Sequence, residues 1–319
     1  MSDDAHAATT TKGLLEGTSP AAGFVAFIIL TLFTFSTALT PIRSDNDVWW
    51  HTKTGQYIVE HGLPETDVFS YTAADVPWHN HEWLSQVMFY GAWKAGGWHG
   101  VIVFKALVVW LTVASLFLLA ARLARNWWVA LLVAVFVVTV GRRMFYPRPP
   151  VVTNLMMAGE LWLLVAVAEG WLRRAWALAL IPFIALWTNL HGGWMAGGVI
   201  FAAFGLEQLI AYFRDRFPRL PLGLPPQVIK PLPLIGLGVL LVAGTFLNPF
   251  GYHLYELPGR VLGDRYLVSQ IGELQPPDFY FVIDFEFIVL GILALGLMTR
   301  FRPRIFELII FLFFLHQAI

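Results

Sequence analysis

The chain has 319 residues, of which 57% are hydrophobic and only 13% are charged. Soluble globular proteins carry about 25% charged residues, because their surfaces face water, so this composition excludes a soluble domain and indicates a protein embedded in lipid. The 21 basic and 21 acidic side chains cancel, so no net charge favours binding to nucleic acid. The absence of cysteine excludes disulfides and thiolate chemistry.

The predicted elements begin after a polar N-terminal segment. Residues 1–20 predict a disordered cytosolic tail, because they lack an apolar run and the basic start of a signal peptide. Residues 21–42 are the first uncharged run long enough to cross a bilayer as a helix. Further apolar runs follow at 101–121, 127–141, 151–168, 175–190, 194–213, 232–247, 281–299 and 305–319. We therefore expect an all-α polytopic membrane protein of about nine transmembrane helices, forming a single domain over residues 21–319.

The sidedness of the chain follows from its arginine and lysine residues, which favour cytoplasmic loops. If the N-terminus is cytoplasmic, every predicted inner loop is basic: these loops hold Arg122, Arg125, Arg173, Arg174, Arg214, Arg216, Arg219, Lys230, Arg300, Arg302 and Arg304. The predicted outer segments, of which 43–100 and 248–280 are the largest, hold most carboxylates, and every histidine except His6 lies in or beside them. We therefore expect the functional face to point away from the cytoplasm.

Two acidic residues open the first outer loop. Asp45 and Asp47 lie two positions apart, a spacing at which carboxylate oxygens can hold Mg²⁺ or Mn²⁺. One of them could instead act as a general base, which requires hydrogen-bond reach to the proton that it takes. The structural alternative is that an aspartate caps a helix starting at Val48, and the spacing leaves these alternatives open.

The same loop carries a group of histidines. His79 and His81 project to one side if their segment is extended, and with Glu82 and His51 they predict a nitrogen-rich metal site. Hydrogen-bonded histidines beside tryptophans are the alternative interpretation. Residues 82–95 have the pattern of a helix that lies in the membrane interface.

Two shorter outer turns also carry polar groups. Arg142, Arg143 and Arg148 form a basic turn on the side where the charge rule disfavours it, which predicts either phosphate binding or a salt bridge to the acidic first loop. Asn189 and His191 lie in a tight turn whose following glycines permit close backbone approach. Because polar residues of membrane proteins face internal cavities, we expect these turns to converge on one cavity.

Several motifs, taken in order, resemble a family of bacterial polytopic membrane proteins over residues 22–319. That family is in turn similar to the GT-C superfamily of membrane glycosyltransferases, which includes protein O-mannosyltransferases and aminoarabinose transferases. The motifs are Asp47-Val48-Trp49-Trp50-His51 with Thr54-Gly55, Asp67-Val68-Phe69-Ser70-Tyr71, His81-Glu82-Trp83-Leu84, Asn189-Leu190-His191-Gly192-Gly193, Asn248-Pro249-Phe250-Gly251 and Gln275-Pro276-Pro277-Asp278-Phe279.

The resemblance implies transfer of a sugar from a polyprenyl-phosphate donor to an envelope acceptor, at the outer face of the bacterial inner membrane. It also implies that Asp47 or Asp45 acts as the catalytic base or holds a divalent metal, Mg²⁺ or Mn²⁺. From their charge and expected sidedness, we expect the donor phosphate to be bound by Arg142, Arg143, Arg148 or Arg260. The residues expected to line the sugar pocket are His81, Glu82, Asn189 and His191.

Two other functions compete with the enzyme. Relatives in the resembled family often continue for further spans, so this chain is a short member or is truncated, and a non-catalytic scaffold that binds other membrane subunits is the first alternative. A transporter of a lipid-linked or anionic solute is the second, and it depends on the carboxylates predicted inside spans, Glu160 and Glu207. A copurified polyprenyl phosphate favours the enzyme, whereas a stable partner chain favours the scaffold.

Overall fold

The computed structural model describes residues 17–42, 46–74, 76–214, 228–256, 259, 263–270, 290–291 and 303–317. Within these residues the regular secondary structure is helical, and an isolated β-bridge joins Thr66 to Pro77. The α-helices are α2 (Pro20–Ala38), α3 (Asp47–His61), α4 (Trp83–Ala124), α5 (Trp127–Gly141), α6 (Pro150–Ala168), α7 (Leu180–Leu190), α8 (Trp194–Tyr212), α9 (Pro231–Thr245), α11 (Arg265–Gln270) and α13 (Ile305–Gln317). Short 3-10 helices are η1 (Arg142–Met144), η2 (Arg174–Ala179) and η4 (Gly251–Tyr255). The predicted all-α class is confirmed.

Among the described residues, four helices are long and apolar enough to cross a membrane: α2, α4, α6 and α8. Shorter apolar helices occupy several other predicted spans: α5, α9, the stretch Arg174–Leu190 and most of α13. The apolar run at 281–299 lies outside the described residues. The composition of these helices supports a membrane protein, and the total number of spans stays a prediction.

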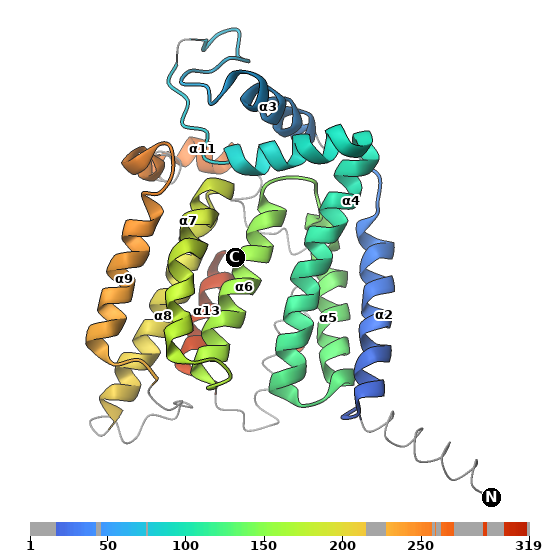
Figure 1. Cartoon of the computed structure of the whole chain (residues 1–319), viewed down its shortest axis with the longest axis vertical. Coiled ribbons are helices and arrows are strands. Elements are labelled where there is room, and N and C mark those ends of the chain that lie inside the picture. Colours follow the sequence, from blue (N-terminus) through green and yellow to red (C-terminus); the bar gives the residue numbers. More distant parts are fainter. Residues whose placement is uncertain are drawn as a thin grey trace, which may run out of the picture. The chain divides into compact units, whose positions relative to one another are not determined.

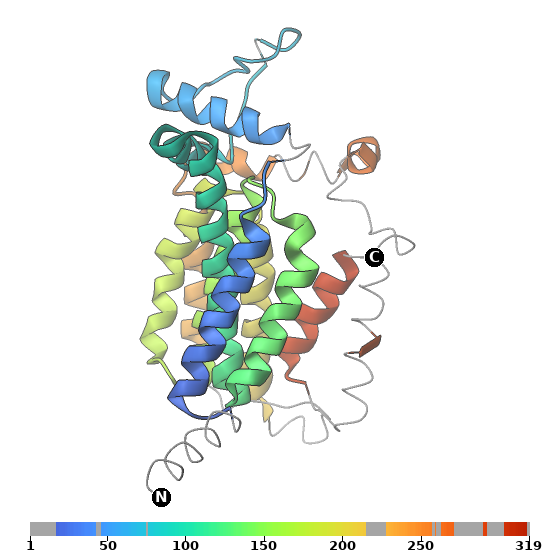
Figure 2. The ribbon, with the colours of Figure 1, turned by 90° about the vertical axis from the view of Figure 1, so that its right-hand side faces the viewer.

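The chain divides into two compact units. Unit 1 consists of Met1–Leu63 and Glu82–Trp162, and unit 2 consists of Pro64–His81 and Leu163–Ile319. In unit 1, α2, α4 and α5 pack side by side (Figures 1 and 2). Small residues permit this packing: Ala22 and Ala26 are fully buried, and a Cβ at Gly23 would lie 2.7 Å from a ring carbon of Trp127. Close contact through small side chains is typical of membrane helices, which gain little from apolar burial against one another.

Two caps fix one end of this bundle. Ser19 accepts a hydrogen bond from the amide of Ala22 at the start of α2, and Asn126 accepts one from the amide of Trp128 at the start of α5. The Trp127 amide donates to the carbonyl of Gly17 at 2.8 Å. The start of α2 therefore meets the turn between α4 and α5, as the alternation of predicted spans requires.

Helix α4 joins two elements that the sequence predicts separately, the interfacial helix at 82–95 and the span at 101–121. The backbone leaves helical geometry at Gly96 and Gly97, and Gly97 has a φ of 58° that favours glycine. Gly100 makes the bend tight, because a Cβ there would lie 2.1 Å from the Ala92 carbonyl oxygen. Figure 1 shows the two parts of α4 meeting at this corner, and α3 lies against the first part.

In unit 2, α7 packs against α9, and α8 packs against α13. Gly244 of α9 permits the first contact, since a Cβ there would lie 3.1 Å from a side-chain carbon of Ile184. The second contact includes an edge-to-face pair of Phe204 and Phe306, whose ring centroids are 6.1 Å apart. These contacts bring the C-terminal ends of α7 and α9 together, where the polar groups of unit 2 gather.

Candidate functional site

Helix α3 places two polar residues of unit 1 one helical turn apart. Asp47 is the first residue of the helix, after the cap residue Asn46, and His51 follows at the spacing that puts side chains on one face. A carboxylate in the first turn is favoured by the helix dipole. Gly55 holds α3 against α4, because a Cβ there would lie 2.0 Å from the carbonyl oxygen of Gln86.

Asp47 pairs with Arg148. Its Oδ2 lies 2.9 Å from Nη1 of Arg148, and the two side chains are 53% and 23% exposed. The guanidinium also lies over the ring of Tyr146, 5.4 Å from its centroid. The acidic first loop and the basic turn therefore meet at one end of unit 1, and the carboxylate and its cation are both accessible to solvent.

The basic turn is built to present Arg148. After α5 ends, the Arg148 amide donates to the Tyr146 carbonyl at 2.8 Å, and the Arg148 carbonyl accepts from the Val151 amide at 3.0 Å. The neighbouring Pro147 and Pro149 are buried. Arg142 in η1 is exposed, and the side chain of Arg143 lies outside the described part of the structure. Arg148 is thus the arginine of this turn that the structure places beside Asp47.

A second polar group in unit 1 surrounds His51. The Nδ1 atom of this buried histidine lies 3.3 Å from Nε2 of Gln86 and 3.7 Å from a carboxylate oxygen of Glu82. The sequence groups His51 and Glu82 in one site, and the structure brings these two together. It pairs them with Gln86, a residue that the sequence analysis did not select because glutamine carries no charge.

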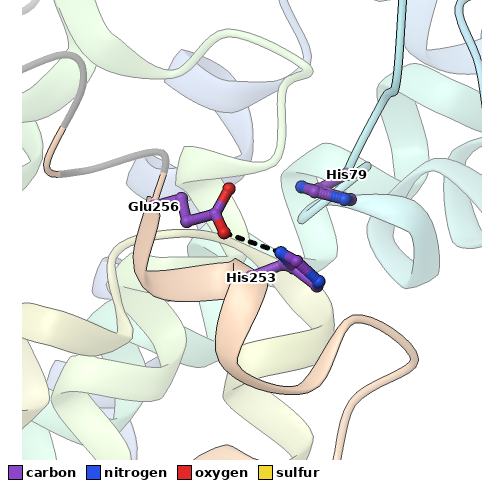
Figure 3. Close-up of side chains that lie close together, drawn as sticks. All are labelled: His79, His253 and Glu256. Atoms are coloured by element: carbon purple, nitrogen blue, oxygen red, sulfur yellow. Dashed lines mark hydrogen bonds and ion pairs between the residues drawn. The ribbon is translucent and has the colours of Figure 1, made fainter.

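Unit 2 contains a cluster of His79, His253 and Glu256 (Figure 3). One potential ligand atom from each side chain lies within 4.8 Å of the others, and all three residues are partly buried. Nδ1 of His253 is 2.7 Å from Oε1 of Glu256, while the rings of His79 and His253 stack with centroids 4.6 Å apart. His79 was predicted in a metal site with His81; the partners that complete a ligand set are instead His253 and Glu256.

The turn before η4 positions His253 and Glu256. Asn248 accepts a hydrogen bond from the Phe250 amide at 2.8 Å and donates to the Thr245 carbonyl at 2.6 Å, and Gly251 follows with a φ of 54°. The motif Asn248-Pro249-Phe250-Gly251 is therefore a structural turn, and its last position has a backbone conformation that favours glycine. After this turn, Leu254 of η4 is buried in unit 2, whereas His253 and Glu256 are only partly buried and lie near His79 (Figure 3).

Tyr255 adds a second anchor to η4. Its hydroxyl contacts the Thr245 hydroxyl, and its ring meets Trp194 edge to face at 5.1 Å. These contacts tie the cluster to the ends of α8 and α9. The sequence signal for the cluster is the spacing of His253 and Glu256, three residues apart on one helical turn, but nothing local indicates that His79 joins them.

The predicted sugar-pocket residues of unit 2 also lie together. His81 and His191 have ring centroids 6.5 Å apart, and Gly192 permits this approach because a Cβ there would lie 3.3 Å from the His81 ring. Nδ1 of His191 accepts a hydrogen bond from the Gly193 amide. Asn189 donates to the carbonyls of Ala185 and Leu247, at 2.7 and 2.9 Å. Asn189 and His191 therefore hold the ends of α7, α8 and α9 in place.

His81 is partly buried, and its environment disfavours a charge. Burial lowers the pKa of His81 from 6.5 to about 4. A hydrogen bond with the backbone of His79 has a smaller effect in the opposite direction. The imidazole is therefore neutral at physiological pH and can accept or donate a hydrogen bond without carrying charge.

The carboxylates predicted inside spans have different surroundings. Glu207 is fully buried and pairs with Arg304, with Oε2 2.7 Å from Nη2, and its other oxygen accepts from the Phe306 amide. Arg304 also reaches Glu169 at 2.7 Å. Glu160 is buried in α6, and its Oε2 has no hydrogen-bond partner among the described residues. Glu207 is thus part of a helix-fastening ion pair.

Two predicted site residues, Asp45 and Arg260, lie outside the described residues. No protein-family model matches the chain, and no curated protein or solved structure shows significant similarity to it.

Proposed function

We propose that this protein is a GT-C-like membrane glycosyltransferase that uses a polyprenyl-phosphate-linked sugar at the outer face of the bacterial inner membrane. The observation that carries the proposal is the accessible pair of Asp47 and Arg148 in unit 1. A carboxylate and a guanidinium at one place supply the two groups that this transfer needs. The apolar helices supply the surroundings of a lipid-linked donor.

The chemistry assigns opposite tasks to the two residues. The acceptor hydroxyl oxygen forms a bond to the anomeric carbon, and the bond from that carbon to the phosphate oxygen breaks. The hydroxyl proton goes to the carboxylate of Asp47, acting as general base. The departing phosphate keeps the electron pair of the broken bond, and the guanidinium of Arg148 stabilises its charge.

The ion pair of Asp47 and Arg148 is compatible with these two roles, base and phosphate-binding cation. The planar guanidinium of Arg148 can bind two oxygens of a carboxylate or of a phosphate at once, so a phosphate can compete with Asp47 for it. When the donor phosphate takes Arg148, the carboxylate of Asp47 becomes available to the acceptor. Arg142 lies in the same turn and is exposed, so it provides a second cation for the phosphate. A divalent metal, Mg²⁺ or Mn²⁺, is an expected cofactor only if Asp45 joins Asp47 as ligand.

The test is transfer by the purified chain in proteoliposomes, using a panel of undecaprenyl-phosphate-linked sugars and envelope acceptors. Asp47→Asn keeps the size and hydrogen bonding of the side chain but removes the base, so we expect transfer to fall by at least ~100-fold. Mass spectrometry of the purified protein should detect a bound polyprenyl phosphate, reduced in Arg148→Gln. Arg125→Gln, at the turn that joins α4 to α5, is the matched control and should retain both sugar transfer and the bound polyprenyl phosphate.

The scaffold remains the alternative function, because an exposed salt bridge also serves to hold a loop. Unchanged donor binding in Arg148→Gln, together with a stoichiometric partner chain, would establish it. Transport is less well supported, because one of the two carboxylates inside spans, Glu207, is paired with Arg304. The other, Glu160, has one oxygen without a hydrogen-bond partner among the described residues.

A further inference from the structure

The cluster of His79, His253 and Glu256 has a ligand set that the proposed glycosyl transfer does not use. Two imidazole nitrogens and one carboxylate oxygen are the donors of many three-ligand zinc sites, which keep a fourth position for water or substrate. Calcium and magnesium favour oxygen-only surroundings. The chemistry of the donors therefore favours zinc among the common divalent ions.

The distances fit a site that needs only small side-chain rotations. Bonds from zinc to nitrogen or oxygen are about 2.0–2.2 Å, which puts two ligands of a tetrahedral ion about 3.3 Å apart. In the structure the three donor atoms lie within 4.8 Å of one another, and the closest pair, His253 Nδ1 and Glu256 Oε1, is 2.7 Å apart. To bind one ion, the donor atoms that are up to 4.8 Å apart must approach one another, and His253 Nδ1 and Glu256 Oε1 must move slightly apart. Both changes require movements of about 1.5 Å or less at the ends of partly buried side chains.

The supporting shell is already in place. His253 and Glu256 stand on η4, which is anchored by the buried Leu254 and by Tyr255, and His79 comes from the inserted segment Pro64–His81. A metal at this point would tie that segment to η4 within unit 2. The hydrogen bond between His253 and Glu256 explains the closeness of those two residues but not the approach of His79.

We propose that His79, His253 and Glu256 bind one Zn²⁺ ion, with a fourth coordination position open to water or an anionic group. The site fastens Pro64–His81 to the turn after α9 and does not depend on the proposed glycosyltransferase activity. The helical turn supplies two ligands at fixed spacing, and the inserted segment supplies the third.

The experiment uses the full-length protein in detergent, purified without a polyhistidine tag and stripped with a chelator. Zinc is added back, free metal is removed, and the bound metal is measured by mass spectrometry. We expect about one zinc per chain for the wild type. His79→Gln, His253→Gln and Glu256→Gln should each weaken binding by at least ~100-fold, more than the loss of outer-shell partners.

The matched control is His61→Gln, which removes an exposed histidine that stacks on Tyr57 of α3. It should bind zinc as the wild type does. Cobalt in place of zinc should give the visible absorption of a four-coordinate site in the wild type and in His61→Gln, but not in the ligand variants.

Size-exclusion profiles and unfolding midpoints of the stripped proteins establish that the variants are folded. If a ligand variant does not fold, the stripped wild type decides the matter through its zinc stoichiometry and its cobalt spectrum. A stripped wild type that takes up no zinc, or zinc binding that survives in all three ligand variants, overturns the proposal.

Discussion

Oδ2 of Asp47 lies 2.9 Å from Nη1 of Arg148, so the residue that opens α3 meets the turn between α5 and α6 within unit 1. The contact brings a carboxylate and a guanidinium from separate loops to the same end of the helices of unit 1. It also explains how a basic turn is tolerated beside an acidic loop. Because the pair is accessible to solvent, it should contribute little to the free energy of unfolding. A variant of the pair can therefore lose activity without losing much stability.

Exchanging the two charges tests this expectation. In the double variant Asp47→Arg/Arg148→Asp the ion pair can reform, and because an accessible pair contributes only about 0–1 kcal/mol, the unfolding free energy should stay within about 1 kcal/mol of wild type. Sugar transfer should nevertheless be lost, since the base and the phosphate-binding cation have changed places. Unfolding midpoints in detergent and transfer in proteoliposomes measure the two effects.

Lys53→Gln is the control for a change of charge on the same helix, because Lys53 is exposed and bonds only Gln56 in the contacts that the described residues show. It should leave both measurements unchanged. Wild-type transfer by the exchanged variant would contradict the assignment of Asp47 as base.

The packing of α3 on α4 yields a second prediction. Gly55→Ala places a methyl group 2.0 Å from the Gln86 carbonyl oxygen, which is backbone and cannot move away cheaply. Overpacking of this kind costs about 1–3 kcal/mol, so the unfolding midpoint should fall and the first part of α4 should become more sensitive to protease. Gly91→Ala is the matched control, because Gly91 is helical and, apart from the adjacent backbone of its own helix, no atom of the described residues lies within 4 Å of the added methyl, so alanine should be neutral or stabilising.

From local patterns in the sequence, the positions of the helices could be predicted better than the contacts between them. The bounds of α5 match the uncharged run at 127–141, because Asn126 caps the helix and polar residues follow Gly141. The meeting of Asp47 and Arg148 was one of two alternatives, since complementary charges on loops expected to share a side suggest a pair. That both aspartates and all the arginines line one cavity stays a prediction, because Asp45 and Arg260 lie outside the described residues.

Long-range partners were not predictable in the same way. His79 and His253 come from distant segments, and only the folding of η4 against α8 and α9 brings them together. The two elements expected at 82–95 and 101–121 agree with the structure, because the backbone of α4 leaves helical geometry at Gly96 and Gly97, between them. Periodicity reports which face of an element is apolar, but it carries no information about which partner that face meets.

The ion pair of Glu207 and Arg304 gives a third prediction. Arg304→Met leaves a fully buried carboxylate without its cation, which should destabilise the protein by about 3–5 kcal/mol. The double variant Arg304→Met/Glu207→Leu removes both charges and should recover most of the loss, although the Phe306 amide loses an acceptor. The measurement is chemical or thermal unfolding of the protein in detergent.

Glu169→Gln is the control, because Glu169 pairs with the same arginine but is 37% exposed, so its loss should cost less than about 1 kcal/mol. If the double variant is as unstable as Arg304→Met alone, the pair is not the fastening contact between α8 and α13.

The low pKa of His81 gives a dependence of stability on pH. Burial lowers the pKa from 6.5 to about 4, so the folded protein keeps the neutral imidazole where the unfolded chain takes up a proton. Above pH 6.5 both states are neutral and the group has no effect. As the pH falls from 6.5 towards 4, the unfolded state is favoured, by up to about 2 kcal/mol at pH 5. Below pH 4 the folded state also binds the proton, and the loss stops growing.

His81→Gln should remove this part of the acid sensitivity, because glutamine keeps a polar side chain but does not titrate. The unfolding midpoints of the wild type and the variant are compared at pH 7 and pH 5, with His61→Gln, an exposed histidine on α3, as control. The drop between the two pH values should be smaller in His81→Gln and unchanged in His61→Gln. Equal drops in all three proteins would mean that His81 is protonated in the folded state at pH 5, and that the neutral imidazole assigned to the polar end of unit 2 is wrong.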